Sequence, residues 1–295
     1  MSQLRRRRLG RAGAASVAAA CSLALSGCGG AGRVAAKLPT RFTHAPFTAS
    51  DFGAPATGAN RWLPLVPGTQ WVRVGTTLVG HRPVQHRVVS TVTDVVKRID
   101  GVSAVAVLDQ DVDAGQIAQE SLDWLAQDRR GTVWFVGAYT EEYAGGRYVT
   151  LRDAWLGGVK AAKPGTLMPA DPTTRTPAWT IAQPPGADPD AAQPVATGQT
   201  QCVPFHCFQD VLVVREGKAS ALDNEFKYYA PGVGQILNTP KSASQHQDVE
   251  QLVNLVHLSR VGLSEFSAEA LKLDRHARAT SPDVFGPSAA ATRAR

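Results

Sequence analysis

Four acidic residues near the middle of the chain have the spacing of a calcium-binding loop. The carboxylates at positions 1, 3, 5 and 12 of such a loop are Asp109, Asp111, Asp113 and Glu120. An EF-hand loop also needs a glycine at position 6, but Ala114 stands there and the glycine follows as Gly115. Two interpretations stay open. Calcium is the one cofactor that the sequence suggests, and a hairpin that turns at residues 113–115 explains the same residues without an ion.

The residues before this acidic group favour the hairpin. Residues 102–108 alternate in the manner of a strand rather than of a helix. On a strand, Asp109, Asp111 and Asp113 share one face, where their mutual repulsion would favour a loosely held cation.

Two of the four cysteines lie close together in the second half of the chain. Four residues separate Cys202 from Cys207, and such thiols pair in an oxidising compartment. We therefore predict a disulfide that contributes roughly 2 kcal/mol by constraining the unfolded chain. The alternative is a metal or redox site that includes His206, although it lacks CxxC spacing and a second ligand pair.

No short enzymatic motif is present, and no catalytic residue is assigned. The sequence contains no GxSxG, SxxK, P-loop, HxH or HExxH pattern. Gly232 and Gly234 resemble the start of a dinucleotide fingerprint, but Leu237 replaces its third glycine, so a turn between strands is the better interpretation. A hydrolase remains an alternative, because catalytic triads are assembled from distant residues.

The N-terminus has the pattern of an export signal followed by a lipid attachment site. Five arginines precede the uncharged residues 12–24, a run too short to span a bilayer. The next four residues, Leu25-Ser26-Gly27-Cys28, resemble a bacterial lipobox. The resemblance implies cleavage before Cys28, a diacylglycerol on its thiol and an acyl chain such as palmitate on its amine. The alternatives are an ordinary cleaved signal and a weaker lipobox at Cys21.

The charge distribution argues against nucleic-acid binding. Five of the 31 Lys and Arg residues lie in the first eleven positions, so 26 basic side chains face 25 acidic ones in the remainder. With this near balance, release of counterions from a nucleic acid would contribute little. We expect an exported protein that is anchored in a membrane on its periplasmic or other extracytoplasmic side.

Composition divides the chain into four segments. The predicted segments are a signal peptide at 1–27, a flexible tether at 28–59, a single β-rich domain at 60–279 and a disordered tail at 280–295. Period-two alternation and turn dipeptides such as Asp100-Gly101 predict an antiparallel meander or curved sheet, of which a half-barrel is one form. The expected strands are 71–79, 84–99, 102–108, 116–127, 132–138, 210–215, 225–229, 235–237 and 252–258.

Two other stretches complete the expected fold. Residues 170–200 are rich in Pro, Asp, Gly and Thr and predict mostly loop, with one strand near 179–182. Apolar residues at helical spacing predict one C-terminal α-helix at 264–277, capped by Ser264.

Residues 62–234 resemble a family of uncharacterised bacterial secreted lipoproteins. The phrases that carry the resemblance are Pro64-Leu65 with Pro67-Gly68-Thr69-Gln70-Trp71, Asp123-Trp124-Leu125-Ala126-Gln127-Asp128 with Gly131-Thr132-Val133-Trp134, Lys163-Pro164-Gly165 with Met168-Pro169-Ala170, and Tyr228-Tyr229-Ala230-Pro231-Gly232-Val233-Gly234. The family commonly has Tyr where Leu125 stands and an acidic residue where Ala138 stands. No catalytic residue carries over from it.

The functional expectation is a cell-envelope lipoprotein that binds a ligand or partner on its sheet. Its aromatic residues predict either a filled core, which we favour, or a cavity for an apolar small ligand. The expected partners are the membrane, through the lipid anchor, and either an apolar small ligand or another envelope protein. An envelope hydrolase and a structural envelope protein are the alternative functions.

Overall fold

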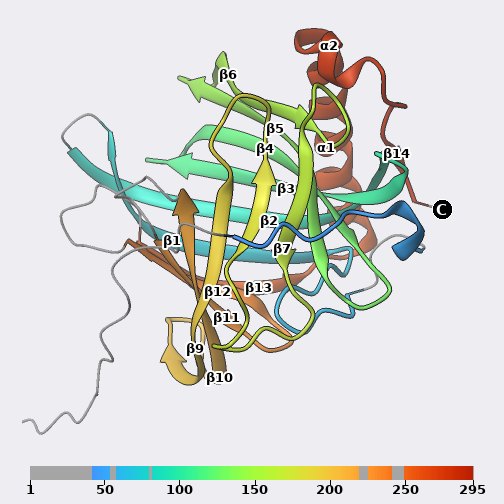
Figure 1. The fold of residues 1–295 in the computed structure, drawn as a ribbon. Coiled ribbons are helices and arrows are strands. Elements are labelled where there is room, and N and C mark those ends of the chain that lie inside the picture. The colour runs from blue at the N-terminus through green and yellow to red at the C-terminus, as the bar shows by residue number, and fades with distance from the viewer. Residues whose placement is uncertain (1–41, 54–57, 80–81, 219–224, 241–248, 295) are drawn as a thin grey trace, which may run out of the picture. The chain divides into compact units, whose positions relative to one another are not determined.

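The structure, a computed structural model, describes residues 42–53, 58–79, 82–218, 225–240 and 249–294 (Figure 1). Nearly all strands precede the α-helices along the chain. The elements are η1 Ala49–Asp51, β1 Thr69–Val79, β2 Arg82–Ile99, β3 Val102–Asp113, β4 Gln116–Gln127, β5 Val133–Ala144, β6 Arg147–Leu156, β7 Lys163–Met168, β8 Trp179–Gln183, β9 Asp190–Cys202, β10 Cys207–Lys218, β11 Glu225–Ala230, β12 Gly234–Pro240, β13 Val249–His257, α1 Arg260–Thr280, α2 Pro282–Phe285 and β14 Thr292–Arg293.

The strands form a closed antiparallel barrel. In the described part of the chain, twelve strands follow one another in the order β1-β13-β12-β11-β10-β9-β8-β7-β5-β4-β3-β2, and β1 also pairs with β2. β6 and β14 lie outside this ring, paired with β5 and β2. The prediction of a mainly β fold with a C-terminal helix is confirmed. The sheet closes completely instead of remaining an open meander or half-barrel, because β1 is paired along both edges.

Tight turns set the register of the first hairpins. Asp100 and Gly101, between β2 and β3, have φ values of 45° and 81°, and Ala114 and Gly115, between β3 and β4, have values of 49° and 84°. Two successive residues with positive φ are the signature of the type I′ turn, whose twist matches that of the flanking strands. Gly115 therefore serves a hairpin, not the position-6 turn of a calcium loop.

Strands β2–β5 are apolar on both faces. In β3, Val105 and Val107 belong to a cluster inside the barrel, whereas Ala104, Ala106 and Leu108 belong to a second cluster on the outer face. Helix α1 covers that outer face with Ala270, Leu273 and Ala277. The part of these strands that is buried on both faces therefore has few polar residues.

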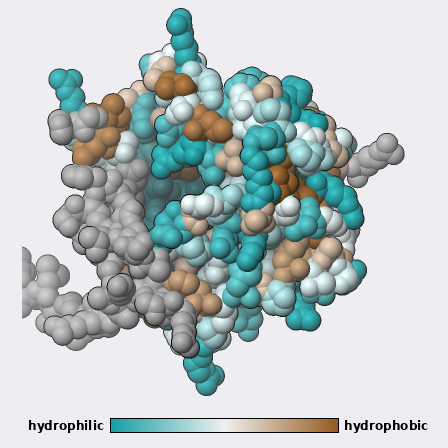
Figure 2. Space-filling view, turned by 45° about the horizontal axis from the view of Figure 1, so that its top comes forward, coloured by the Kyte–Doolittle hydropathy of each residue, from teal (hydrophilic) through white to brown (hydrophobic). Residues whose placement is uncertain are grey.

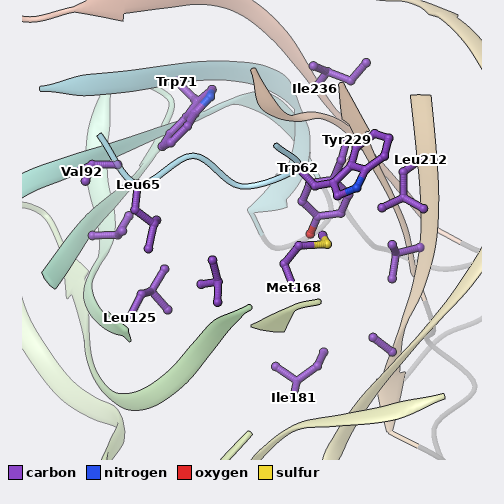
Figure 3. Packing of buried hydrophobic residues seen from close by; sticks show 14 of the residues in the cluster. Trp62, Leu65, Trp71, Val92, Leu125, Met168, Ile181, Leu212, Tyr229 and Ile236 are labelled. Atoms are coloured by element: carbon purple, nitrogen blue, oxygen red, sulfur yellow. The ribbon is translucent and has the colours of Figure 1, made fainter. Parts of the chain in front are cut away.

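A chain segment before β1 fills one half of the barrel interior. Trp62 and Leu65 pack there with Trp71, Leu125 and Met168 (Figure 3). The buried Asn60 holds this segment in place. Its Nδ2 donates to the carbonyl oxygens of residues 131, 168 and 169, and its Oδ1 accepts from the backbone N–H groups of residues 62 and 63.

The C-terminal region is more ordered than the sequence predicts. Helix α1 begins at Arg260, where the N-cap Ser259 accepts from the N–H of Gly262, so it is longer than the predicted 264–277. The disordered tail expected at 280–295 is wrong for its described residues, since they include α2 and β14. The physical reason is burial: Phe285 is fully buried against the outer face of the barrel.

Two other expectations need correction. The flexible tether was expected to extend to residue 59, but Phe47 and Phe52 pack against Trp134, and Thr43 bridges to Trp179. Aromatic burial thus orders residues that composition alone marks as a linker. Residues 170–200 contain most of β9 in addition to β8, because pairing with β10 overrides the turn-forming composition.

None of the helices in the described ranges is long and apolar enough to cross a membrane.

Candidate functional site

A cavity of about 640 Å³ lies inside the barrel, next to the packed apolar half. Its walls come from strands on all sides, including β1, β3, β4, β6, β11 and β13. Figure 2 shows a hollow in the molecular surface whose visible wall is mostly hydrophilic. Pockets of this volume suit small organic ligands.

Strand pairing arranges the wall in rows. One row contains polar residues that are paired from strand to strand, namely Ser90, Asp109, Ser121, Thr140 and Asp153. The row farther from the β3–β4 turn contains Val107, Asp123 and Ala138. Beyond it, Leu125 and Phe135 form part of the apolar floor. The cavity is therefore polar at the end near the β3–β4 turn and apolar at the opposite end.

The wall has more acidic than basic side chains. Its seven carboxylates are Asp109, Asp111, Asp123, Asp153, Asp190, Glu225 and Glu250, and its three cations are Arg73, Arg152 and Lys227. Each cation already has an acidic partner. Lys227 Nζ lies 2.8 Å from Glu216 and 3.1 Å from Glu225, and Arg73 Nε lies 3.1 Å from Glu250.

Arg152, the third cation, pairs with a carboxylate outside the cavity lining. Its Nη1 lies 2.9 Å from Glu142. Within the described residues, the five aspartates of the wall consequently have no ion-pair partner within 4.0 Å. In addition, Asp109 Oδ1 is sealed from solvent and has no hydrogen-bond donor among the described residues.

The environment raises the pKa of all five aspartates. Burial is the main cause for each, because it disfavours the charged carboxylate. For Asp111, burial and repulsion by Asp109 raise the pKa to about 7. For Asp123, burial and the charge of Asp109 raise the pKa well above its usual range. Lys227 has the opposite balance: burial lowers its pKa, but Glu216 and Glu225 raise it by more.

The structure does not bring together the four residues of the expected calcium loop. Asp109 and Asp111 line the interior cavity, whereas Glu120 is on the other face of the sheet and accepts a 2.7 Å hydrogen bond from Gln110. Among the described residues, no group of three or more His, Cys, Asp or Glu side chains is arranged to hold a metal ion. Strand alternation separates the ligands that sequence spacing had grouped.

Asp113, the remaining member of that group, pairs with a histidine near the β3–β4 turn. Its Oδ1 lies 2.7 Å from Nδ1 of the buried His86. Glu250, a wall residue, lies 4.0 Å from His86 Nε2. A carboxylate-oriented imidazole next to a cavity is the feature of this site that a hydrolase could use.

The cysteines lie away from the cavity. Cys202 and Cys207 form a disulfide with an S–S distance of 2.01 Å, at the ends where β9 and β10 meet. Because their sulfurs are bonded to each other, these cysteines supply no thiolate for the alternative metal site with His206. Cys28, the proposed lipidation site, and Cys21 lie outside the described residues.

Most of the cavity residues belong to no site that the sequence predicts. Asp153, Asp190, Arg73 and Lys227 lie in no candidate motif, and Asp123 appears only in the family resemblance. A usable signal was present in β4, where Asp123 occupies the same face as Leu125 and interrupts the apolar inner row. A charged residue on the buried face of a strand is such a signal because burial of an unpaired charge is costly.

Comparison with known proteins gives only remote similarities. No protein-family model matches the chain, and no curated protein sequence matches it. Among solved structures, an exported-protein candidate with a YmcC-like fold from Bacteroides fragilis is 13% identical, with a TM-score of 0.34 over 66% of this chain and 99% of its own. A lipoprotein candidate from Parabacteroides distasonis is 11% identical, with a TM-score of 0.31 over 66% of this chain and 98% of its own.

Proposed function

We propose that the protein is an exported, lipid-anchored envelope protein that binds a small organic ligand inside its barrel. The observation that carries this proposal is the cavity of about 640 Å³, which combines an apolar floor with a polar wall. Ligand pockets generally have this composition, in which apolar surface supplies affinity and a few polar groups orient the ligand. The expected site thus moves from the surface of the sheet to the interior of the barrel.

The arrangement of the barrel interior favours a binding site over incomplete packing as the explanation of the cavity. Protein interiors are close-packed, and cavities of several hundred Å³ are rarely left without use. Here Asn60 and the segment that follows it fill one half of the barrel, whereas charged residues on adjoining strands keep the other half open. The cavity is thus a consequence of residue choice along the strands.

A cavity-filling pair of variants tests ligand binding. Thr140 lines the cavity, whereas Thr150 on β6 is exposed. We expect Thr140→Phe to reduce the binding of a neutral fluorescent probe such as N-phenylnaphthylamine at least tenfold, and Thr150→Phe to leave it unchanged. Probe binding that is absent in the wild type, or equal in both variants, would contradict a ligand site in the barrel.

The lipid anchor needs its own experiment. Cys28→Ser removes the thiol that a lipobox would modify. We expect this change to release the protein from the membrane fraction, because two or three acyl chains hold a protein on a bilayer and none leaves it soluble in water. Intact mass of the wild-type protein should correspond to a chain that begins at Cys28 and carries acyl groups. Unchanged membrane association of the variant would reject the anchor.

A hydrolase is the second candidate, favoured only by the His86–Asp113 hydrogen bond beside the cavity. Turnover of generic ester or phosphate substrates that His86→Gln abolishes would establish it. Absence of turnover together with probe binding would leave the binding function alone.

A further inference from the structure

The charges of the cavity specify what kind of ligand fits it, an argument that rests on the proposed binding function. Seven carboxylates line the wall, and its three cations are all held in ion pairs. The unpaired acidic groups are concentrated on β3 and β4, where Asp109, Asp111 and Asp123 occupy successive rows. In their ionised form these carboxylates repel anions and attract a positive charge.

The same three aspartates are poor ligands for a metal ion. A divalent cation requires several oxygen atoms that converge at 2.0–2.6 Å, and no such group occurs among the residues that the structure describes. An ammonium group has weaker geometric demands, since it is a compact charge with donors in several directions. It could interact with carboxylates on neighbouring strands without convergence.

The floor of the cavity adds an apolar requirement. Leu65, Leu125 and Phe135 line the end farther from the β3–β4 turn, and the indole of Trp71 lies in the row of Asp109 and Ser90. An alkyl or aryl group would bury its surface there, at about 25 cal/mol per Å² of apolar area removed from water.

We infer that the cavity binds an organic ammonium compound, with the charged nitrogen among Asp109, Asp111 and Asp123 and the apolar part against Trp71, Leu65 and Phe135. The ligand completes two features that the protein leaves incomplete. Its charge compensates the aspartates that have no ion-pair partner, and its carbon skeleton fills the apolar end of the cavity. Burial that raises the pKa of these carboxylates in the empty site is consistent with this role.

Three probes of equal chain length test the inference. The full chain carrying Cys28→Ser is titrated at pH 8 with octylammonium, octanol and octanoate, and affinity is measured by calorimetry. We expect octylammonium to bind at least tenfold more tightly than octanol, and octanoate to show no measurable binding. Equal affinity of octylammonium and octanol would overturn the inference but leave ligand binding intact. Absence of binding by all three would overturn both.

Matched variants assign the effect to the cavity. We expect Asp109→Asn and Asp123→Asn each to lower the ratio of octylammonium to octanol affinity at least threefold, while octanol binds as before. Asp171→Asn is the control, because Asp171 is exposed and does not line the cavity. Circular dichroism and urea midpoints establish that each variant is folded. An unchanged ratio in the two cavity variants would place the ammonium elsewhere and overturn the inference.

Discussion

The two faces of strands β2–β5 bury charged groups in opposite ways. On the outer face, Lys97 of β2 is buried beneath helix α1, where its Nζ lies 2.9 Å from Asp274 Oδ1 and donates to the carbonyl of Ala289 at 2.8 Å. The other oxygen of Asp274 accepts from the N–H of Ala291. On the inner face, Asp109 and Asp123 are half-buried and have no ion-pair partner in the described part of the chain.

Glu141 extends the contrast, because it too is on the outer face and is saturated with donors. The hydroxyls of Tyr139 and Tyr143 donate to it at 2.5 and 2.6 Å, and His276 of α1 forms a third contact. The difference teaches that this protein can neutralise a buried charge where only stability is at stake. Carboxyl groups without a cationic partner therefore mark the face on which a ligand is expected, in accord with the clustering of perturbed pKa values at functional sites.

The outer face should be the more sensitive to loss of one charge. We expect Asp274→Ala to lower the free energy of unfolding by about 3–5 kcal/mol, because it leaves Lys97 buried without its anion. Urea unfolding measures the change. The double variant Lys97→Met/Asp274→Leu is the control and should lose much less, since no unpaired charge remains. Equal losses in both variants would show that packing, not the charge, is responsible.

Glu141 gives a second, smaller test of the saturated face. We expect Glu141→Gln to lower the free energy of unfolding by about 2 kcal/mol, because hydrogen bonds to a charged acceptor are replaced by weaker ones. The exposed Glu142, which pairs with Arg152 at the surface, is the matched control, and Glu142→Gln should cost well under 1 kcal/mol. Comparable losses for the two changes would contradict the special position of Glu141.

The inner face should respond to pH in the opposite sense from a paired carboxylate. The pKa of Asp111 is about 7 in the folded protein and near 3.9 when unfolded, so the folded state binds its proton more tightly. Its contribution to stability is present at low pH and is lost as pH rises from about 4 to 7. The groups that influence it are Asp109, His86, Glu250 and Arg73.

Replacement of Asp111 by an uncharged residue removes this loss of stability at high pH. We expect Asp111→Asn to unfold with the same free energy as the wild type near pH 4.5 and to be more stable by roughly 1–3 kcal/mol at pH 8. Urea midpoints across this range measure the difference, and Asp171→Asn should follow the wild-type curve. A variant that is less stable than the wild type at pH 8 would mean that Asp111 is paired after all.

The smallest expected effect concerns the helix that covers the outer face. Ser259 accepts from the N–H of Gly262 and caps α1. We expect Ser259→Ala to cost about 1 kcal/mol of unfolding free energy and to leave ligand binding unchanged, because the cap lies on the outer side of the wall. A loss of binding without loss of stability would contradict the separation of the two faces.

Local patterns predicted the first hairpins well because their determinants are local. Asp100-Gly101 and Ala114-Gly115 set turn types, and alternation in β2–β5 set which residues share a face. The closure of the sheet could not be predicted in this way, because pairing of Trp71 with Leu255 depends on residues nearly the whole domain apart. The order after Thr280 was missed for the same reason, since Phe285 is buried by strands distant in sequence.

The cavity illustrates the same limit more sharply. The acidic residues of β3 were noticed from their spacing, but spacing along the chain suggested convergence on an ion, whereas the barrel separates Glu120 from Asp109. Asp153, Asp190 and Lys227 join the site only through the ring of strands. The face that each residue occupies on its strand predicts part of the acidic wall, but it does not predict the residues on the opposite side of the cavity.

The pairing of β1 with both neighbours also determines when the barrel can form. Its hairpin with β2 needs only adjacent residues, whereas its contact with β13 joins Thr69 to His257. Contacts between residues so distant in sequence form slowly, because the chain entropy of a long loop is lost before the contact is gained. While the chain is synthesised from its N-terminus, one edge of β1 therefore stays unpaired until β13 is available. An open edge of that kind is a site for mispairing with other chains. A chaperone that shields unpaired strands would be needed most in this interval.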